Sequence, residues 1–276
     1  MQDDAESFHS SYRALEEKMR LRAESDGDIF LPNPEPKGSV QNVLICMEPS
    51  LGGRSEREFR AWVEEGARNF LNSIEDFLLH FSVRQYLCES EERYHITDVS
   101  KGAMPVERAG KDRAERYDRW YDLLKEELDL VATSDANIFA VGNAVSEFLK
   151  DRGFERAFTR ILHYSPQAAR ARNAGIEGHE NRFERFRETV PLEDVISTAR
   201  DVFEVSTVSD QFREETLSRL KNRELTPSRK KLLFNYKLTF ERERSRLNLV
   251  SRISTPKCLS TVEHGGQSDT FDSLDA

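Results

Sequence analysis

The middle of the chain alternates between two kinds of hydrophobic pattern. Short apolar runs, with the length and composition of buried strands, occur at 41–47, 94–100, 137–141 and 158–164. Between them, apolar residues recur every three to four positions, as on helices, over 55–87, 113–132 and 144–153. Strands that alternate with helices predict an α/β fold: a three-layer αβα arrangement around a central, mostly parallel four-stranded sheet.

The two ends of the chain follow a different pattern. A helix is expected at 10–24, before a linker rich in proline and glycine, and the pattern is helical throughout from about residue 190. We divide the chain into an N-terminal helix and linker (1–39), an α/β domain (40–205), a basic helical extension (206–253) and a tail expected to be disordered (254–276).

Composition narrows the class of protein. The 276 residues carry a net charge of −9, and 33% of them are charged, which is typical of a soluble, helix-rich protein. No apolar run approaches the roughly 18 residues of a membrane span, and the acidic N-terminus does not resemble a signal peptide. Three scattered cysteines argue against a disulfide framework and a four-thiolate metal site. We expect a cytoplasmic monomer with no membrane partner, no metal and no cofactor.

Polar residues at the strand ends are the first candidates for a site. In a parallel sheet flanked by helices, ligands bind at the carboxyl ends of the strands. The residues that fall there are Glu48, Asp98, Asn143 after Gly142, and His163. A single carboxylate delivered by a core strand, followed by Pro49 and a glycine pair, is typical of a site loop.

Four segments, taken together, resemble the uracil-DNA glycosylase superfamily. Cys46-Met47-Glu48-Pro49-Ser50 is similar to its first motif, "HITDVSKG" to its second strand, "NIFAVGNAVSEFL" to its third strand and helix, and His163-Tyr164-Ser165-Pro166 to its His-Pro-Ser-Pro motif. The resemblance covers about 40–205 in the family's order. The chain departs from the motifs at Cys46 and Tyr164, and it has no cysteine ligands for an iron–sulfur cluster.

The resemblance implies a role in catalysis for two residues. Cleavage of an N-glycosidic bond builds positive charge on the sugar and negative charge on the departing base. Glu48 stands where the family has its Asp or Asn, on the sugar side. His163 stands where the family has the histidine that donates to O2 of the base.

The last motif and the basic helix are candidates for DNA binding. The resemblance assigns Ser165 and Pro166 to the DNA backbone and Gln167, with help from Arg170 or Arg172, to the position that inserts into the base stack. Residues 219–252 hold eleven Lys and Arg against three Glu. We expect Arg229, Lys230 and Lys231 to face phosphates while neighbouring apolar residues pack on the core; the alternative is a solvated helix face.

Two substitutions bear on the base. Ser50 replaces the tyrosine that closes the C5 side of the pocket in strict uracil enzymes. Asp98 replaces an asparagine and, if ionised, only accepts hydrogen bonds, which suits the N4 amino group of cytosine and requires a proton shared with N3. These residues favour a C5-modified cytosine, hydroxymethylated or glucosylated, as found in phage DNA, and a defence role. Asn143 is a further recognition candidate, and Phe59 or Phe70 would stack on the flipped base.

Other functions stay open. The alternatives are a uracil-DNA glycosylase of base-excision repair, a non-catalytic nucleotide-binding module of the same fold, and an unrelated doubly wound enzyme. Neither a P-loop lysine motif nor a Gly-x-Gly-x-x-Gly motif is present in the sequence, which excludes the commonest phosphate-binding versions of such folds.

Overall fold

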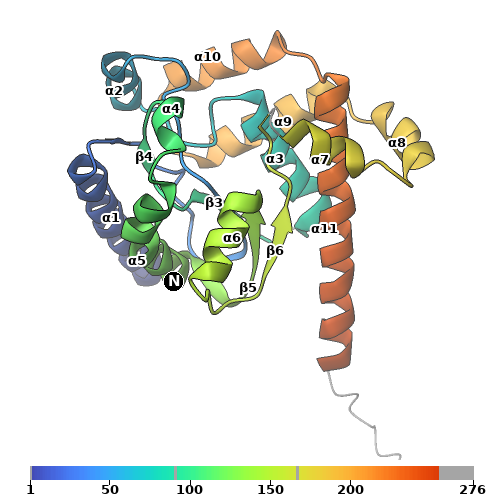
Figure 1. Cartoon of the computed structure of the whole chain (residues 1–276), viewed down its shortest axis with the longest axis horizontal. Coiled ribbons are helices and arrows are strands. Elements are labelled where there is room, and N and C mark those ends of the chain that lie inside the picture. Colours follow the sequence, from blue (N-terminus) through green and yellow to red (C-terminus); the bar gives the residue numbers. More distant parts are fainter. Residues whose placement is uncertain (1, 90–91, 166–167, 255–276) are drawn as a thin grey trace, which may run out of the picture.

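A parallel four-stranded sheet forms the centre of the protein, in a computed structural model that describes residues 2–89, 92–165 and 168–254. The strand order is β3 (Tyr94–Asp98), β2 (Val40–Cys46), β5 (Ala132–Val141), β6 (Phe158–Ile161). All three neighbouring pairs are parallel. In order along the chain the strands are therefore arranged 2-1-3-4, and the predicted fold class is confirmed (Figure 1).

The eleven α-helices of the described residues have these bounds: α1 Gln2–Ser25, α2 Glu56–Glu64, α3 Ile74–Ser82, α4 Val106–Ala109, α5 Arg113–Val131, α6 Asn143–Asp151, α7 Ala169–Ala174, α8 Glu180–Arg187, α9 Leu192–Val205, α10 Asp210–Lys221 and α11 Pro227–Ser254. A π-helical turn, η1 (Val83–Leu87), extends α3. Among the described residues, no helix combines the length and the apolar character that crossing a membrane requires.

Successive residues of β2 point to opposite faces of the sheet, and both faces are buried. Leu44 and Cys46 belong to a core shared with α3, α9 and α11, whereas Val43 and Ile45 belong to a second core shared with α5 and α6. This explains why the strand sequence is apolar throughout instead of alternating.

The helical region expected at 55–87 is broken, which corrects the prediction of one helical stretch. Ser55 begins α2 with a capping box, and Ser73 begins α3 with another. Between them the backbone takes positive φ at Gly66 (101°) and at Phe70 (59°). The apolar spacing missed the break because residues of both helices are buried in the interior.

The N-terminal segment packs directly against the α/β domain. Leu15, Met19 and Ala23 of α1 enclose Trp120 of α5 in a small core. After α1, β1 (Ile29–Phe30) pairs antiparallel with β4 (Gly102–Ala103), which follows β3. The linker is thereby held beside the carboxyl end of β3.

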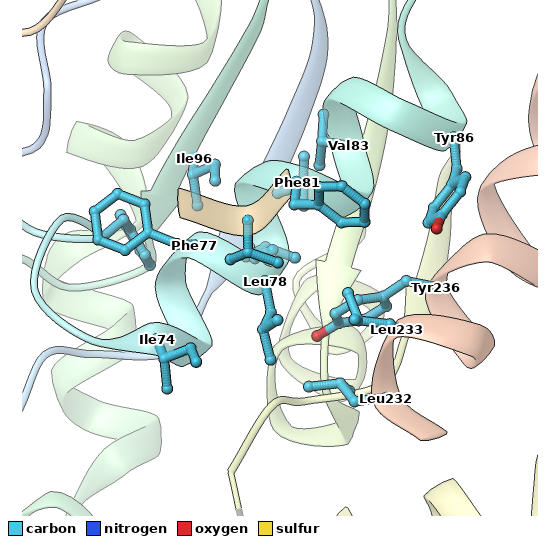
Figure 2. Packing of buried hydrophobic residues seen from close by; sticks show 14 of the residues in the cluster. Ile74, Phe77, Leu78, Phe81, Val83, Tyr86, Ile96, Leu232, Leu233 and Tyr236 are labelled. Carbon is cyan, nitrogen blue, oxygen red and sulfur yellow. The ribbon is translucent and has the colours of Figure 1, made fainter. Parts of the chain in front are cut away.

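The first half of α11 is part of the largest core. Leu232, Leu233 and Tyr236 are each at most 1% exposed, and Figure 2 shows them beside Leu78 of α3 and Tyr86 of η1. The expected packing of the apolar side of this helix is confirmed. The second half of α11 extends past the rest of the molecule (Figure 1). The tail expected to be disordered lies, from residue 255, outside the described residues.

Candidate active site

Glu48 and Asp98 lie at the carboxyl ends of two neighbouring strands. Cys46, the last residue of β2, is the register partner of Asp98, the last residue of β3. The pairing continues past the sheet, because the backbone N–H groups of Val99 and Ser100 donate to the carbonyls of Cys46 and Met47. Glu48 therefore leaves the carboxyl edge from an inner strand, near the point where the strand order reverses, which is where such folds bind ligands, and Asp98 leaves it from the neighbouring edge strand.

The Glu48 carboxylate is buried and fully paired. Only 3% of the side chain is exposed. Arg113, the first residue of α5, donates to Oε1 from Nη2 (2.7 Å) and Nε (3.2 Å), and the Tyr117 hydroxyl donates to Oε2. The Arg116 guanidinium lies 3.7 Å from Oε1. The first turn of α5 thus supplies two cations and one hydroxyl to a single acid.

The surroundings of Asp98 favour its neutral acid form, whereas the sequence prediction considered an ionised carboxylate. The residue is 3% exposed, and Asn69 Nδ2 donates to its Oδ2 at 2.7 Å. Burial raises the pKa of Asp98 to about 8, against the lowering effects of Asn69 and Lys101, and the negative charge of Glu48 adds to the rise. A neutral carboxyl donates through one oxygen and accepts through the other.

His163 follows β6 and is half-buried. Its Nδ1 accepts a hydrogen bond from the backbone N–H of Ser165 (3.0 Å), so the neutral ring carries its proton on Nε2. Burial, with the nearby charges of Arg172 and Arg113, lowers the pKa of His163 to about 4. Gly142, at φ 95°, makes room for the ring: a Cβ there would lie 3.2 Å from the His163 Cβ.

Arg113 links the three candidates electrostatically. It pairs with Glu48, its charge lowers the pKa of His163, and the charge of Glu48 in turn raises the pKa of Asp98. Two non-glycine residues of the described chain have positive φ, Phe70 and Asp112, and each adjoins a residue that contacts these acids: Asn69 and Arg113 respectively. Backbone strain of this kind clusters at functional sites.

Three of the recognition candidates have other surroundings. Phe59 of α2 is 1% exposed in a core with Leu31 and Leu51, so the prediction that it might stack on a base is wrong. Asn143 is exposed, and its Oδ1 accepts from Arg160 (2.5 Å) instead of facing the acids. Ser50 is exposed beside Met104, with which it forms a β-bridge.

Phe70 is buried in the largest core, so it meets the same objection as Phe59 as a residue that would stack on a base. It is 2% exposed, and its backbone carbonyl contacts His80 Nε2 at 3.1 Å. It directly follows Asn69, the residue that binds Asp98, and it adopts the left-handed backbone conformation that bulky side chains rarely take.

The last motif is held in place by Arg172, which corrects the role given to that residue. Arg172 is 5% exposed, and its guanidinium donates to Ser228 Oγ and to the backbone carbonyls of Tyr164 and Ser165. It fixes the motif to α11 and is not available to DNA. Arg170 is exposed on α7, and the other two residues of this prediction, Pro166 and Gln167, lie outside the described residues.

The basic residues at the start of α11 bind to the protein itself, which corrects the prediction of a free cationic face. Arg229 pairs with Glu75 of α3 (2.7 Å). Lys230 donates to the carbonyl of Arg187 (2.5 Å), and Lys231 donates to Asn173 Oδ1 (2.8 Å).

Sequence analysis missed Asn69, Arg113 and Tyr117, all of which bind the two acids. For Arg113 and Tyr117 a signal existed, since the helix after a parallel strand begins at the carboxyl edge, and its first turn must lie beside the strand ends. For Asn69 no local pattern points to Asp98, because 29 positions separate the two residues along the chain.

The other end of the sheet holds a cavity of about 720 Å³. It is lined by residues that begin β2 and β3, among them Val40 and Tyr94, and by Phe70 and His80. Across residues 2–89, 92–165 and 168–254, no three His, Cys, Asp or Glu side chains are grouped as a metal ion would need.

Comparisons of this chain with protein-family models, with curated proteins and with solved structures find no match. The function is therefore inferred from the geometry and chemistry of the site.

Proposed function

We propose that this protein is a DNA glycosylase that excises a flipped, non-canonical pyrimidine and leaves an abasic site. The observation that supports the proposal is that an acid, a neutral carboxyl and a neutral imidazole, Glu48, Asp98 and His163, stand at the carboxyl ends of β2, β3 and β6, with the Arg113 charge acting on both Glu48 and His163. The 2-1-3-4 strand order supports it, because Glu48 leaves the sheet near the reversal point.

Each group suits one part of the reaction. The N1–C1′ bond breaks, and its electron pair moves to the base. His163 donates Nε2–H to O2 of the departing base, and its pKa of about 4 keeps it neutral at physiological pH. The Glu48 carboxylate stabilises the positive charge that develops on the sugar.

A neutral Asp98 complements the hydrogen-bonding edge of cytosine better than an ionised Asp98 does. Its Oδ1–H donates to N3, and the proton moves to N3 as the base leaves in a neutral tautomer. Water then adds to C1′, and the proton it loses returns Asp98 to the neutral form. The N4 amino group donates to Oδ2, which has a second lone pair beside the Asn69 hydrogen bond.

The substrate we propose is a C5-modified cytosine of phage DNA, hydroxymethylated or glucosylated. Ser50 is small and exposed, so position 50 does not close the C5 side. Uracil is the second candidate, since a neutral carboxyl also complements uracil, donating to O4 and accepting from N3–H.

The site must open before a base enters. Glu48 and Asp98 are almost fully buried, whereas the Arg113 side chain is 33% exposed. We expect a DNA phosphate to draw Arg113 away from Glu48, which uncovers the carboxylate and removes its nearest cation. If Arg113 stays in place, Glu48 is neutralised, and the protein is a nucleotide-binding module that does not cleave.

DNA contacts are assigned to exposed cations near the strand ends. Lys111 precedes α5 and Arg170 lies on α7, both exposed. Together with Arg113 they would bind phosphates around the site and make affinity dependent on salt.

The deciding experiment offers the purified protein four matched oligonucleotides, as single strands and duplexes, that carry cytosine, 5-hydroxymethylcytosine, its glucosylated form or uracil at one position. Abasic sites are scored by alkaline cleavage. We expect cleavage at the modified cytosines and little at the unmodified one. Cleavage at uracil alone would select the repair enzyme. Binding without cleavage of any strand, unchanged in Glu48→Gln, would overturn the glycosylase assignment.

A further inference from the structure

Two buried acids compete for one buried ammonium behind the site. Lys101, after β3, and Glu127 of α5 are each 1% exposed, and Lys101 Nζ lies 2.5 Å from Glu127 Oε2. The same Nζ donates to the backbone carbonyl of Asp98 at 2.6 Å. The lysine is therefore next to Asp98 but is turned toward Glu127.

The hydrogen bonds show which acid holds the negative charge. The Glu127 carboxylate accepts hydrogen bonds from the Lys101 ammonium, from His95 Nε2 (2.9 Å) and from the Thr97 hydroxyl (2.9 Å to Oε2). The carboxyl of Asp98 has one donor among the described residues, Asn69. A buried carboxylate needs several donors or a cation, so Glu127 is the anion, and Asp98 holds a proton.

We propose that Glu127 is a positioning residue that keeps Asp98 a hydrogen-bond donor toward the substrate base, by holding the Lys101 ammonium away from the Asp98 carboxyl. The protonation of Asp98 stands on the contacts alone. Its use toward a base rests on the proposed function and limits the substrate class to bases that present an acceptor at this edge, N3 of a cytosine or O4 of a uracil.

A chain of amides fixes which oxygen of Asp98 is protonated. Asn69 Oδ1 accepts from the backbone N–H of Phe70 (3.1 Å), so Asn69 Nδ2 must be the group that faces Asp98 Oδ2. The second Nδ2 hydrogen goes to Asn33 Oδ1 (3.2 Å), and Asn33 Nδ2 donates in turn to Thr97 (3.0 Å). Oδ2 is thus an acceptor, and the proton is left on Oδ1.

The other groups around Asp98 do not replace Lys101. Glu48, from the loop after β2, repels a second negative charge. Tyr117 of α5 and Cys46 of β2 are buried, and Tyr164 after β6 is partly buried. Loss of hydration raises the pKa of each well above its ordinary value, so they add no charge at pH 7. Lys101 is the cation beside Asp98, and it forms its ion pair with Glu127 instead, which agrees with the pKa of Asp98 near 8.

The test follows the carboxyl carbon of Asp98 by ¹³C NMR through a pH titration, without any substrate. Asp98→Asn identifies the signal by its loss. In the wild type we expect the signal to titrate near pH 8. Glu127→Gln should leave Lys101 free to stabilise the Asp98 carboxylate and move the titration down by at least about one pH unit. A wild-type titration near pH 4 would overturn the proposal without needing any variant to fold.

A double variant separates tuning from structure. Glu127→Gln with Lys101→Met removes both charges, so the Asp98 titration should return toward its wild-type midpoint. A general loosening of the fold would instead leave the single and double variants alike, and that result contradicts the proposal.

A second experiment tests the role in function by measuring the rate of single-turnover base release as a function of pH. The wild-type rate should fall above about pH 8, and the fall should begin at lower pH in Glu127→Gln. If the NMR shifts occur but no base is released from any oligonucleotide, the proposed function fails while the role of Glu127 stands. If base is released and the NMR titration is unmoved by Glu127→Gln, the role of Glu127 fails alone.

Discussion

The carboxyl edge of the sheet and the start of α11 are the two charged regions that the sequence predicts to be functional. In the structure, the charged residues of these two regions have different surroundings. At the sheet edge, residues far apart in the chain converge, and their partners alter their protonation. At the start of α11, Arg229, Lys230 and Lys231 each contact a neighbouring residue, such as Glu75 beside Arg229. The topology of a parallel sheet determines which residues lie at the strand ends, so these positions can be predicted from the sequence. A run of basic residues does not show which acids, distant in the sequence, will pair with them in the folded protein.

The largest effect should come from Glu48. We expect Glu48→Gln to lower single-turnover base release by on the order of 10²-fold or more, because the amide cannot stabilise positive charge on the sugar. Gln is preferred to Ala, since Ala would remove the acceptor of the Arg113 guanidinium. Glu147→Gln, at an exposed position of α6, is the matched control and should keep the wild-type rate. Equal rates in both variants would place the chemistry elsewhere.

Replacing His163 by alanine should lower the rate of base release by a similar factor. With His163 intact, the rate should have a distinctive pH dependence. A histidine of ordinary pKa near 6.5 would change charge between pH 5.5 and 7.5. Burial and two arginines lower the pKa of His163 to about 4, so its neutral form persists across that range. The rate should therefore show no inflection there, and an inflection near pH 6.5 that His163→Ala removes would contradict the environment described.

Asp98→Asn should have a smaller and selective effect. The amide keeps an acceptor toward Asn69 and a donor toward the base, but it cannot transfer its proton to N3 of cytosine. Release of modified cytosine should fall roughly ten- to hundredfold, as expected for about 1–3 kcal/mol, while activity on uracil holds or rises. Competition between the two oligonucleotides in one reaction measures the ratio directly. An unchanged ratio would show that Asp98 does not select the base.

How much the sequence predicts can be judged from these residues. The apolar runs located all four sheet strands, and with them Glu48, Asp98 and His163 at one edge. Protonation was out of reach, because the neutral state of Asp98 depends on Glu127, 29 positions away, taking Lys101. The core role of Phe59 and the buried role of Arg172 were equally hidden, since aromatic and basic residues look the same in sequence whether they bind DNA or the protein's own backbone.

The smallest effect is expected at α11, and it decides whether the two regions really differ. Arg229 and Glu75 are 21% and 30% exposed, so breaking their pair by Arg229→Gln should lower the free energy of unfolding by at most about 1 kcal/mol in chemical denaturation. Neutralising Lys230 and Lys231 as well should change DNA affinity by less than about threefold, because their ammonium groups already contact Arg187 and Asn173. The matched comparison is Lys111→Gln with Arg170→Gln, at exposed positions near the strand ends, which should weaken binding on every sequence and reduce its salt dependence. If the α11 variant shows that loss instead, these lysines exchange their internal contacts for phosphates, and the helix joins the sheet edge as part of one DNA-binding surface.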